Sequence, residues 1–224
     1  MTDIQTNHYF DWASTSPADK TILQEALDET AAVWGNPSSI HAAGKEAREL
    51  LEQARKRCAD VLGVKAEKLY FTSGGTESDH IPLLSVLNRP QKGTVLISSI
   101  EHPAIREMAL EMKKCGMEVI SIPSDKDGII TPEAVVKSLT PETVIVCVMA
   151  VNNETGAIQP VYEIADAITS ATAGKRRPKF HVDCVQAAGK IPFDLSCAGI
   201  DSAAFSAHKI CGPRGIGLLY MKDA

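Results

Sequence analysis

The 224-residue chain lacks the features that mark several classes of protein. No apolar stretch approaches the ~20 residues that a transmembrane helix needs. Residues 1–5 contain neither a basic start nor an apolar segment, so no signal peptide is expected. The formal charge of -5 is mild, which argues against a nucleic-acid-binding surface. We therefore expect a protein that binds neither membranes nor nucleic acids.

The six cysteines also lack an informative spacing. They are Cys58, Cys115, Cys147, Cys184, Cys197 and Cys211. None forms a CxxC pair and no ligand cluster has zinc spacing, so we predict no metal site. A disulfide framework is not expected in a chain of this length, and most of the thiols are interpreted as small core residues in a reducing cytoplasm.

The length of 224 residues suits one large domain or two small ones, and the 44% of residues that are apolar are ample for a packed core. An irregular N-terminal arm is expected over residues 1–16 and the main domain over 17–224. A helix is predicted after Pro17, with apolar residues such as Leu23 and Leu27 on one face. The clearest helical spacing runs from Ala47 to Leu62, and Gly63 is a plausible stop.

From residue 69 onward, short apolar strands alternate with helices. Strands are predicted at 69–72, 94–98, 118–122, 143–149, 179–183 and 201–206, with a possible last one at 215–221. The run 143–149 is continuously apolar, as in a strand buried on both faces. The alternation predicts an α/β fold, a mostly parallel sheet with helices on both faces. Ligands bind such sheets where strands end and loops begin.

Polar residues gather at those predicted strand ends. The turn 72–78 holds two glycines, Gly74 and Gly75, before a predicted helix, which suits a phosphate, although a plain strand-to-helix turn is equally compatible. Asp183 ends a strand and is suited to pairing with a cationic ring nitrogen or, alternatively, to capping a helix. His102 follows another strand, where an imidazole can stack on an aromatic cofactor or be an ordinary loop histidine.

Two further strand ends complete the set. The segment 152–156 is compatible with a binding loop or a simple Asn/Gly turn. Lys209 lies between an apolar strand, 203–205, and a Gly/Pro-rich turn, where a desolvated amine can attack a carbonyl. Five strand ends thus offer a phosphate cradle, a ring-nitrogen partner, a stacking imidazole and an amine. Pyridoxal 5′-phosphate (PLP) requires these same parts.

The motifs resemble those of the NifS/IscS-like cysteine desulfurases of the class V aminotransferase group. The matching segments are 9–17, 35–39, 71–79, 101–102, 151–156, 181–183 with Gln186, and 206–209 with 212–215. Together they cover nearly the whole chain. The resemblance implies the large domain of a fold type I PLP enzyme, and relatives are dimers that supply sulfur for iron–sulfur clusters.

The resemblance also implies a role for each matched position. Lys209 is expected to be the Schiff-base lysine and proton carrier, and Asp183 to pair with the pyridine nitrogen. Gln186 is expected to bind the phenolic oxygen of the ring, and His102 to stack on the ring and move protons. The phosphate is expected to contact Gly75, Thr76, Ser206 and His208. Asn153 is expected near the ring oxygen and the substrate carboxylate.

The chain departs from this family where sulfur chemistry is concerned. Relatives are far longer, and their C-terminal part carries the sulfur-accepting cysteine and a substrate-binding arginine. Cys211 lies close to Lys209, but that position varies in the family. We therefore expect a truncated cofactor domain, without the small domain, from an enzyme acting on L-cysteine or a related amino acid with a possible sulfur-acceptor protein. Another class V enzyme, such as a selenocysteine lyase or aminotransferase, or a non-catalytic dimerising fragment, remains an alternative.

Overall fold

A computed structural model describes residues 8–196 and 199–223, so Cys197 lies outside the described residues. Seven strands form one sheet in the order β1-β7-β6-β5-β4-β2-β3. They are β1 (Leu69–Thr72), β2 (Thr94–Ser98), β3 (Glu118–Ile122), β4 (Thr143–Cys147), β5 (Lys179–Asp183), β6 (Ser202–Ser206) and β7 (Gly217–Met221). Strands β3, β2, β4, β5 and β6 run parallel, which confirms the predicted sheet, whereas β7 is antiparallel to both β6 and β1.

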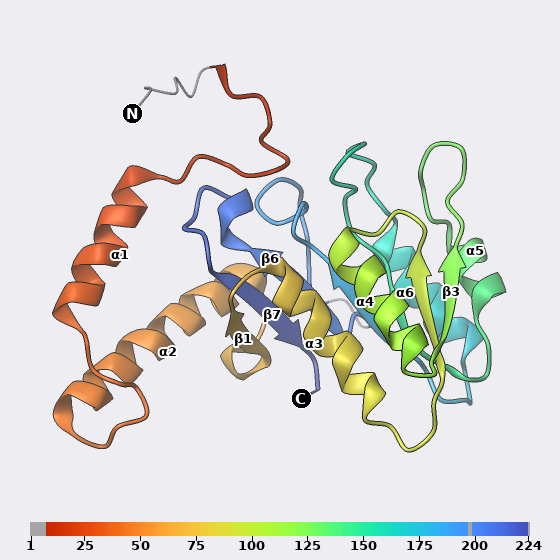
Figure 1. Ribbon diagram of the computed structural model, residues 1–224, viewed down its shortest axis with the longest axis horizontal. Coiled ribbons are helices and arrows are strands. Elements are labelled where there is room, and N and C mark those ends of the chain that lie inside the picture. The colour runs from red at the N-terminus through yellow and green to blue at the C-terminus, as the bar shows by residue number, and fades with distance from the viewer. Residues whose placement is uncertain (1–7, 197–198, 224) are drawn as a thin grey trace.

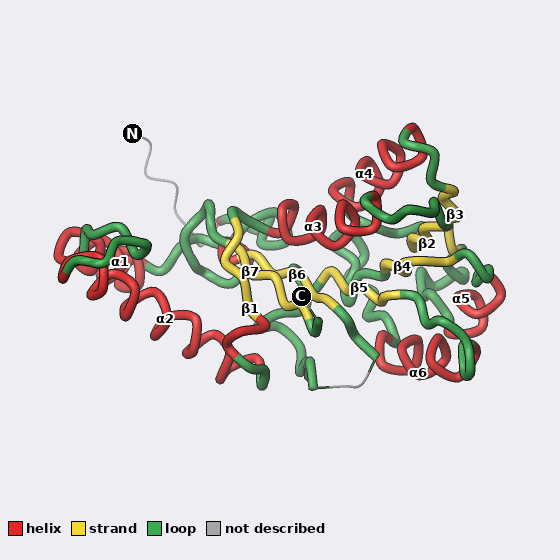
Figure 2. Tube along the Cα trace, turned by 90° about the horizontal axis from the view of Figure 1, so that it is seen from below, coloured by secondary structure: helices red, strands yellow, loops and turns green. Residues whose placement is uncertain are grey.

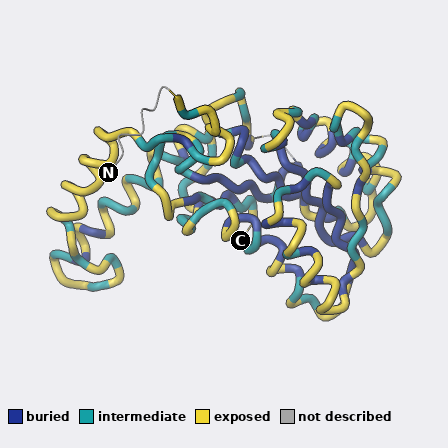
Figure 3. The backbone as a smooth tube through the Cα atoms, turned by 45° about the horizontal axis from the view of Figure 1, so that its top comes forward, coloured by how far each residue is buried: buried dark blue, intermediate teal, exposed yellow. Residues whose placement is uncertain are grey.

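Helices cover both faces of this sheet. Helices α3 (Gly75–Leu87) and α4 (Pro103–Lys114) lie on one face, and α5 (Pro132–Ser138) and α6 (Val161–Ala171) lie on the other (Figure 2). Strands β2, β4 and β6 are buried along their whole length, as their apolar sequences predict. The central strands appear as a continuous buried layer in Figure 3. The carboxyl ends of four parallel strands, β2, β4, β5 and β6, therefore meet at one edge.

Helix capping follows the local sequence. The Thr131 side chain caps α5, and Pro132 occupies its first turn. His102 caps α4 in the same way, with Pro103 following it. Gly63 adopts a left-handed conformation (φ 66°) after α2 (Ala42–Leu62), which confirms it as a helix stop. A 3₁₀ turn, η2 (Ala66–Lys68), then leads into β1.

The first two helices extend away from the sheet (Figure 1). Helix α1 (Lys20–Ala32) forms where it was predicted, but none of its residues is buried. Its apolar residues Ile22, Leu23 and Leu27 are exposed by 47%, 40% and 62%. Amphipathic spacing thus predicted the helix, while the other described residues leave its apolar face uncovered. Among the described residues, no helix has both the length and the apolarity needed to cross a membrane.

Candidate active site

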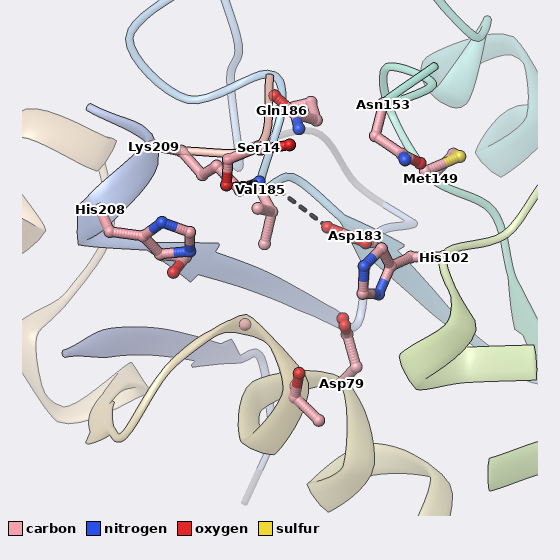
Figure 4. A pocket seen from close by; sticks show the side chains of 13 residues that line it. Ser14, Asp79, His102, Met149, Asn153, Asp183, Val185, Gln186, His208 and Lys209 are labelled. Atoms are coloured by element: carbon pink, nitrogen blue, oxygen red, sulfur yellow. Dashed lines mark hydrogen bonds between the residues drawn. The ribbon is translucent and has the colours of Figure 1, made fainter. Parts of the chain in front are cut away.

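A cavity of about 260 Å³ opens at the carboxyl ends of the parallel strands. Figure 4 shows the side chains that line it. All nine residues that the sequence singled out lie on its wall: Gly75, Thr76, His102, Asn153, Asp183, Gln186, Ser206, His208 and Lys209. Ser14, Asp79, Met149 and Val185 complete the lining. Segments that are far apart in the sequence are therefore brought together as the parallel topology predicts.

One wall is the N-terminus of α3. Its cap residue is Gly74, which offers no side-chain cap, so N–H groups of the first turn stay available to an anion. The turn is held by Glu77, whose carboxylate accepts a 2.6 Å hydrogen bond from the Ser73 N–H. A Cβ atom added to Gly75 would lie 2.7 Å from the Cγ2 atom of Val185. Glycine is therefore required by the close approach of Val185.

Asp183 points into the cavity from the end of β5 and is itself buried. Its Oδ1 atom accepts a 2.8 Å hydrogen bond from the Val185 N–H. The residues that follow form hydrogen-bonded turns rather than a helix, so the alternative of a helix cap at Asp183 is wrong. Burial raises the pKa of the Asp183 carboxyl to about 8, and the neighbouring Asp79 contributes.

His102 lines the cavity and caps α4 at the same time. Its Nδ1 atom accepts a 3.1 Å hydrogen bond from the Ala104 N–H, which fixes the ring against the cavity wall (Figure 4). Burial lowers the pKa of the imidazole, and the cations Lys209 and Arg106 lower it further. The ring is therefore held mostly neutral at neutral pH. Its capping role and a role toward a ligand are compatible.

Lys209 enters the cavity from η3 (Ala207–Lys209), directly after β6. Its Nζ atom donates hydrogen bonds to the backbone carbonyls of Ala13, at 2.5 Å, and Ser14, at 2.7 Å. The side chain is half-buried rather than enclosed. Burial lowers the pKa of its amine and the nearby Lys190 lowers it further, whereas Asp183 acts in the opposite direction.

The two asparagines in the loop after β4, Asn152 and Asn153, differ in their contacts. The Oδ1 atom of Asn152 accepts hydrogen bonds from the N–H groups of Glu154 and Thr155, at 3.0 and 2.8 Å. Asn152 is thus committed to the turn, as the simpler interpretation of this segment predicted. Asn153 instead lines the cavity and an adjoining hollow that also contains Trp12.

Comparison with known proteins agrees with this arrangement. A family profile described as "Aminotransferase class-V" matches residues 8–224. The chain belongs to the aminotransferase class-V family. It is 40% identical to a "NifS/IcsS protein homolog" of Lactobacillus delbrueckii subsp. bulgaricus, over 96% of this chain and 55% of the relative. It is 37% identical to "Cysteine desulfurase IscS" of Dictyoglomus turgidum, over 96% of this chain and 54% of the relative.

Solved structures share this fold. A structure named "NIFS-LIKE PROTEIN" superposes with a TM-score of 0.90 at 36% identity, over 96% of this chain and 59% of the other. One named "SspA in complex with cysteine" superposes with a TM-score of 0.89 at 30% identity, over 96% of this chain and 61% of the other. The chain spans about half the length of the curated relatives that it matches.

One group in this class V cavity was missed from the sequence. Asp79 was noted only as part of a motif, yet it lines the cavity one helical turn after Gly75 and is buried. Its Oδ1 atom lies 3.1 Å from Nε2 of His181, whose Nδ1 atom lies 2.8 Å from Oγ of Ser202. Burial raises the pKa of Asp79, and burial lowers the pKa of His181 to about 4. Four-residue spacing from Gly75 along the helix is the signal that places Asp79 on the cavity side.

Glu101 lies in the same buried group. Its Oε1 atom accepts hydrogen bonds from the Ser98 hydroxyl, at 2.5 Å, and from the Met149 N–H, at 2.8 Å. Burial raises its pKa to about 7, while the hydrogen bond from Ser98 opposes the shift. Asp79, Glu101 and Asp183 thus form a buried acidic group on one side of the cavity.

The N-terminal arm closes the opposite side. Thr15 Oγ1 lies 3.0 Å from Nδ1 of His208, and Gln186 Nε2 donates a 2.7 Å hydrogen bond to the Ala13 carbonyl. An adjoining hollow shares the α3 N-terminus and His208 with the cavity and is also lined by Arg214. Arg214, His208 and hydroxyl groups therefore gather at the α3 N-terminus, whereas Asp79 of the acidic group lies one turn further along the same helix.

Proposed function

We propose that the chain carries the PLP-binding part of a cysteine desulfurase. The observation that supports this most strongly is the convergence of all nine predicted residues on one cavity in a class V chain. Class V aminotransferases and cysteine desulfurases are PLP enzymes. The parent enzyme would act on L-cysteine as a homodimer, in the cytoplasm, and would pass sulfur to an acceptor protein.

The chemistry of the cavity fits the cofactor. The uncapped N-terminus of α3, with Thr76, Ser206 and His208 beside it, offers N–H and hydroxyl donors to a phosphate. Asp183 is a buried carboxyl that a protonated pyridine nitrogen would satisfy through a charge-assisted hydrogen bond. Pairing with this cation would counter the desolvation that raises the pKa of Asp183.

When bound, PLP supplies an electron sink for the bond that is broken at the α-carbon of the substrate. The residues of this chain would bind and orient the reacting groups. Lys209 presents a primary amine whose lowered pKa increases the neutral, nucleophilic fraction. The same Nζ atom is placed to take up and return a proton. His102 presents a neutral imidazole held by its cap on α4. Because Nδ1 accepts the Ala104 N–H, the ring carries its proton on Nε2, so it would stack on the cofactor ring and offer that proton to a ligand.

The substrate assignment comes from the relatives and from the adjoining hollow. Relatives are named cysteine desulfurases, and one solved relative is named as a complex with cysteine. The hollow beside the cavity is lined by Trp12, Asn153, Lys190 and Lys209 and has a volume of about 470 Å³. It would receive the amino acid, with Asn153 donating an amide hydrogen to the carboxylate.

A second function is supported for the chain taken by itself, namely binding the cofactor without sulfur transfer. No cysteine is among the residues that line the cavity in the described part of the chain. Cys147 and Cys184 are fully buried, and burial raises the pKa of both thiols, which makes them poor nucleophiles. Sulfide release from cysteine by the purified chain is therefore expected at background level. Robust release that Cys211→Ser abolishes would instead show that an internal thiol serves as acceptor.

Titration of the purified chain with PLP tests the proposal. Wild type is expected to develop a visible absorption band, and Lys209→Ala is expected to lack it. Lys175→Ala, at an exposed loop after α6, is the matched control and should retain the band. An unchanged spectrum in Lys209→Ala, or no band in wild type, would contradict the proposed function.

A further inference from the structure

Lys190 makes a specific contact with a buried side chain of the cavity wall. It lies in the turns after β5, four residues beyond Gln186, and its side chain is largely exposed. Its Nζ atom donates a 2.5 Å hydrogen bond to the Oε1 atom of Gln186. Gln186 is only 8% exposed and lines the cavity. The resemblance to cysteine desulfurases gave Lys190 no role.

The partners of Gln186 determine which way its amide points. An ammonium group only donates hydrogen bonds, so the amide oxygen must face Lys190. The backbone carbonyl of Ala13 only accepts, so the amide nitrogen must face Ala13, 2.7 Å away. Oxygen and nitrogen of an amide are commonly exchanged in structures, but partners of opposite type at its two ends allow one orientation only.

This orientation decides what the cavity offers to a ligand. In the part of the chain that the structure describes, Ala13 takes one of the two amide hydrogens of Gln186. The second hydrogen on the same nitrogen remains for a ligand, because the Gln186 side chain lines the cavity. An anionic oxygen on the cofactor ring requires such a donor, whereas a reversed amide would present an acceptor and repel it.

We infer that Lys190 is a positioning residue that orients the Gln186 amide so that the cavity presents an N–H donor to an anionic ring oxygen of the bound cofactor. This inference rests on the proposed function for the identity of the ligand. The orientation of the amide is a property of the chain alone. Lys190 acts through Gln186 and need not contact the cofactor.

The positive charge of Lys190 acts on the cavity directly as well as through the orientation of the Gln186 amide. Lys190 also lowers the pKa of Lys209, so loss of its charge changes the Lys209 amine as well. Lys190→Met removes both the donor and the charge, whereas Lys190→Arg retains both. A double-mutant cycle with Gln186→Ala separates the orientation of the amide from the charge effect on Lys209. In the Gln186→Ala background there is no amide for Lys190 to orient, so only the charge effect remains.

The cycle is measured as the dissociation constant for PLP and the wavelength of its visible band. Lys190→Met is expected to weaken PLP binding by about three- to tenfold, the loss typical of one hydrogen bond. The double variant should bind no more weakly than Gln186→Ala alone. Lys190→Arg should restore wild-type affinity and wavelength, and Lys175→Met should leave both unchanged. Effects that multiply in the double variant would overturn the positioning role, because Lys190 would then act independently of Gln186.

A second measurement needs no cofactor. Side-chain amide signals of Gln186 in ¹H–¹⁵N NMR spectra can be assigned by their loss in Gln186→Ala. Lys190→Met should shift and broaden them in the cofactor-free protein, and Lys190→Arg should not. Unchanged signals in Lys190→Met would overturn the inference even if PLP binds. Absence of a visible band in wild type would count against the proposed function, while these signals still test the orientation.

Discussion

The amine of Lys209 donates a 2.5 Å hydrogen bond to the backbone carbonyl of Ala13, which lies 196 residues earlier in the sequence. The same carbonyl accepts a hydrogen bond from Gln186 Nε2. The N-terminal arm is therefore part of the cavity wall and holds two of the residues proposed to contact the cofactor. A ligand that bonds to the Lys209 nitrogen therefore competes with the hydrogen bonds that this nitrogen donates to the Ala13 and Ser14 carbonyls.

Ser16 fastens the arm to the turn that carries Lys209. Its hydroxyl donates a 2.9 Å hydrogen bond to the His208 carbonyl and accepts a 2.6 Å hydrogen bond from the Cys211 N–H. Because Ser16 is buried, Ser16→Ala leaves these groups without that partner and should lower the free energy of unfolding by about 1–3 kcal/mol. Urea denaturation measures this loss. The exposed Ser38→Ala should change it by less than about 0.5 kcal/mol, and an equal loss in both variants would contradict the role of Ser16.

Asp183 should make the stability of the cofactor-free protein depend on pH. Burial raises its folded-state pKa to about 8, whereas an unfolded aspartate titrates near ~4. Between these values the folded state binds the extra proton, so the free energy of unfolding falls as pH rises through this window. Below pH ~4 both states are protonated and the penalty is absent.

Asp183→Asn mimics the protonated side chain and removes this dependence. Relative to wild type, the variant should gain about 1–3 kcal/mol in free energy of unfolding between pH 5 and pH 9. Glu101 titrates in the same window, since burial raises its pKa to about 7, so the difference between the two proteins is the informative quantity. A difference that stays constant over this pH range would rule out the perturbed carboxyl.

Gly75 and Val185 should be coupled. The added Cβ of Gly75→Ala would lie 2.7 Å from the Val185 Cγ2 atom, so this variant should lose about 1–3 kcal/mol in free energy of unfolding. In a Val185→Ala background the obstructing methyl group is gone, and Gly75→Ala should cost less than about 0.5 kcal/mol. Chemical denaturation of the four proteins measures the coupling. Strictly additive losses would show that the close approach does not limit the size of residue 75.

The sequence predicted the parallel sheet because alternating strands and helices admit few topologies. It did not predict that β7 runs antiparallel between β6 and β1, since apolar runs such as 69–72 and 217–221 carry no information on direction. The ends of the predicted strands pointed to His102, Asp183 and Lys209 and to the turns 72–78 and 152–156, whereas Gln186 was found only through the family resemblance. The contacts of Ala13 could not be predicted from the sequence. They are made by its backbone carbonyl, and every residue type has one.

Asp79 and Lys190 show a similar limit. Their effects depend on partners brought close only by folding, namely His181, 102 residues from Asp79, and a Gln186 amide that is anchored at its other end by Ala13. The exposure of the apolar face of α1 was equally unpredictable, because amphipathic spacing shows that a helix has an apolar face and not what covers it.

The Lys209 nitrogen is expected to form a covalent bond to the cofactor. Borohydride reduction of the PLP-loaded chain, followed by digestion and mass spectrometry, tests it directly by making the bond between this nitrogen and the aldehyde carbon permanent. A single stoichiometric modification is expected on the peptide that contains Lys209, and it should be lost in Lys209→Ala. Stoichiometric modification of Lys190 or of any other lysine, with Lys209 unmodified, would contradict it.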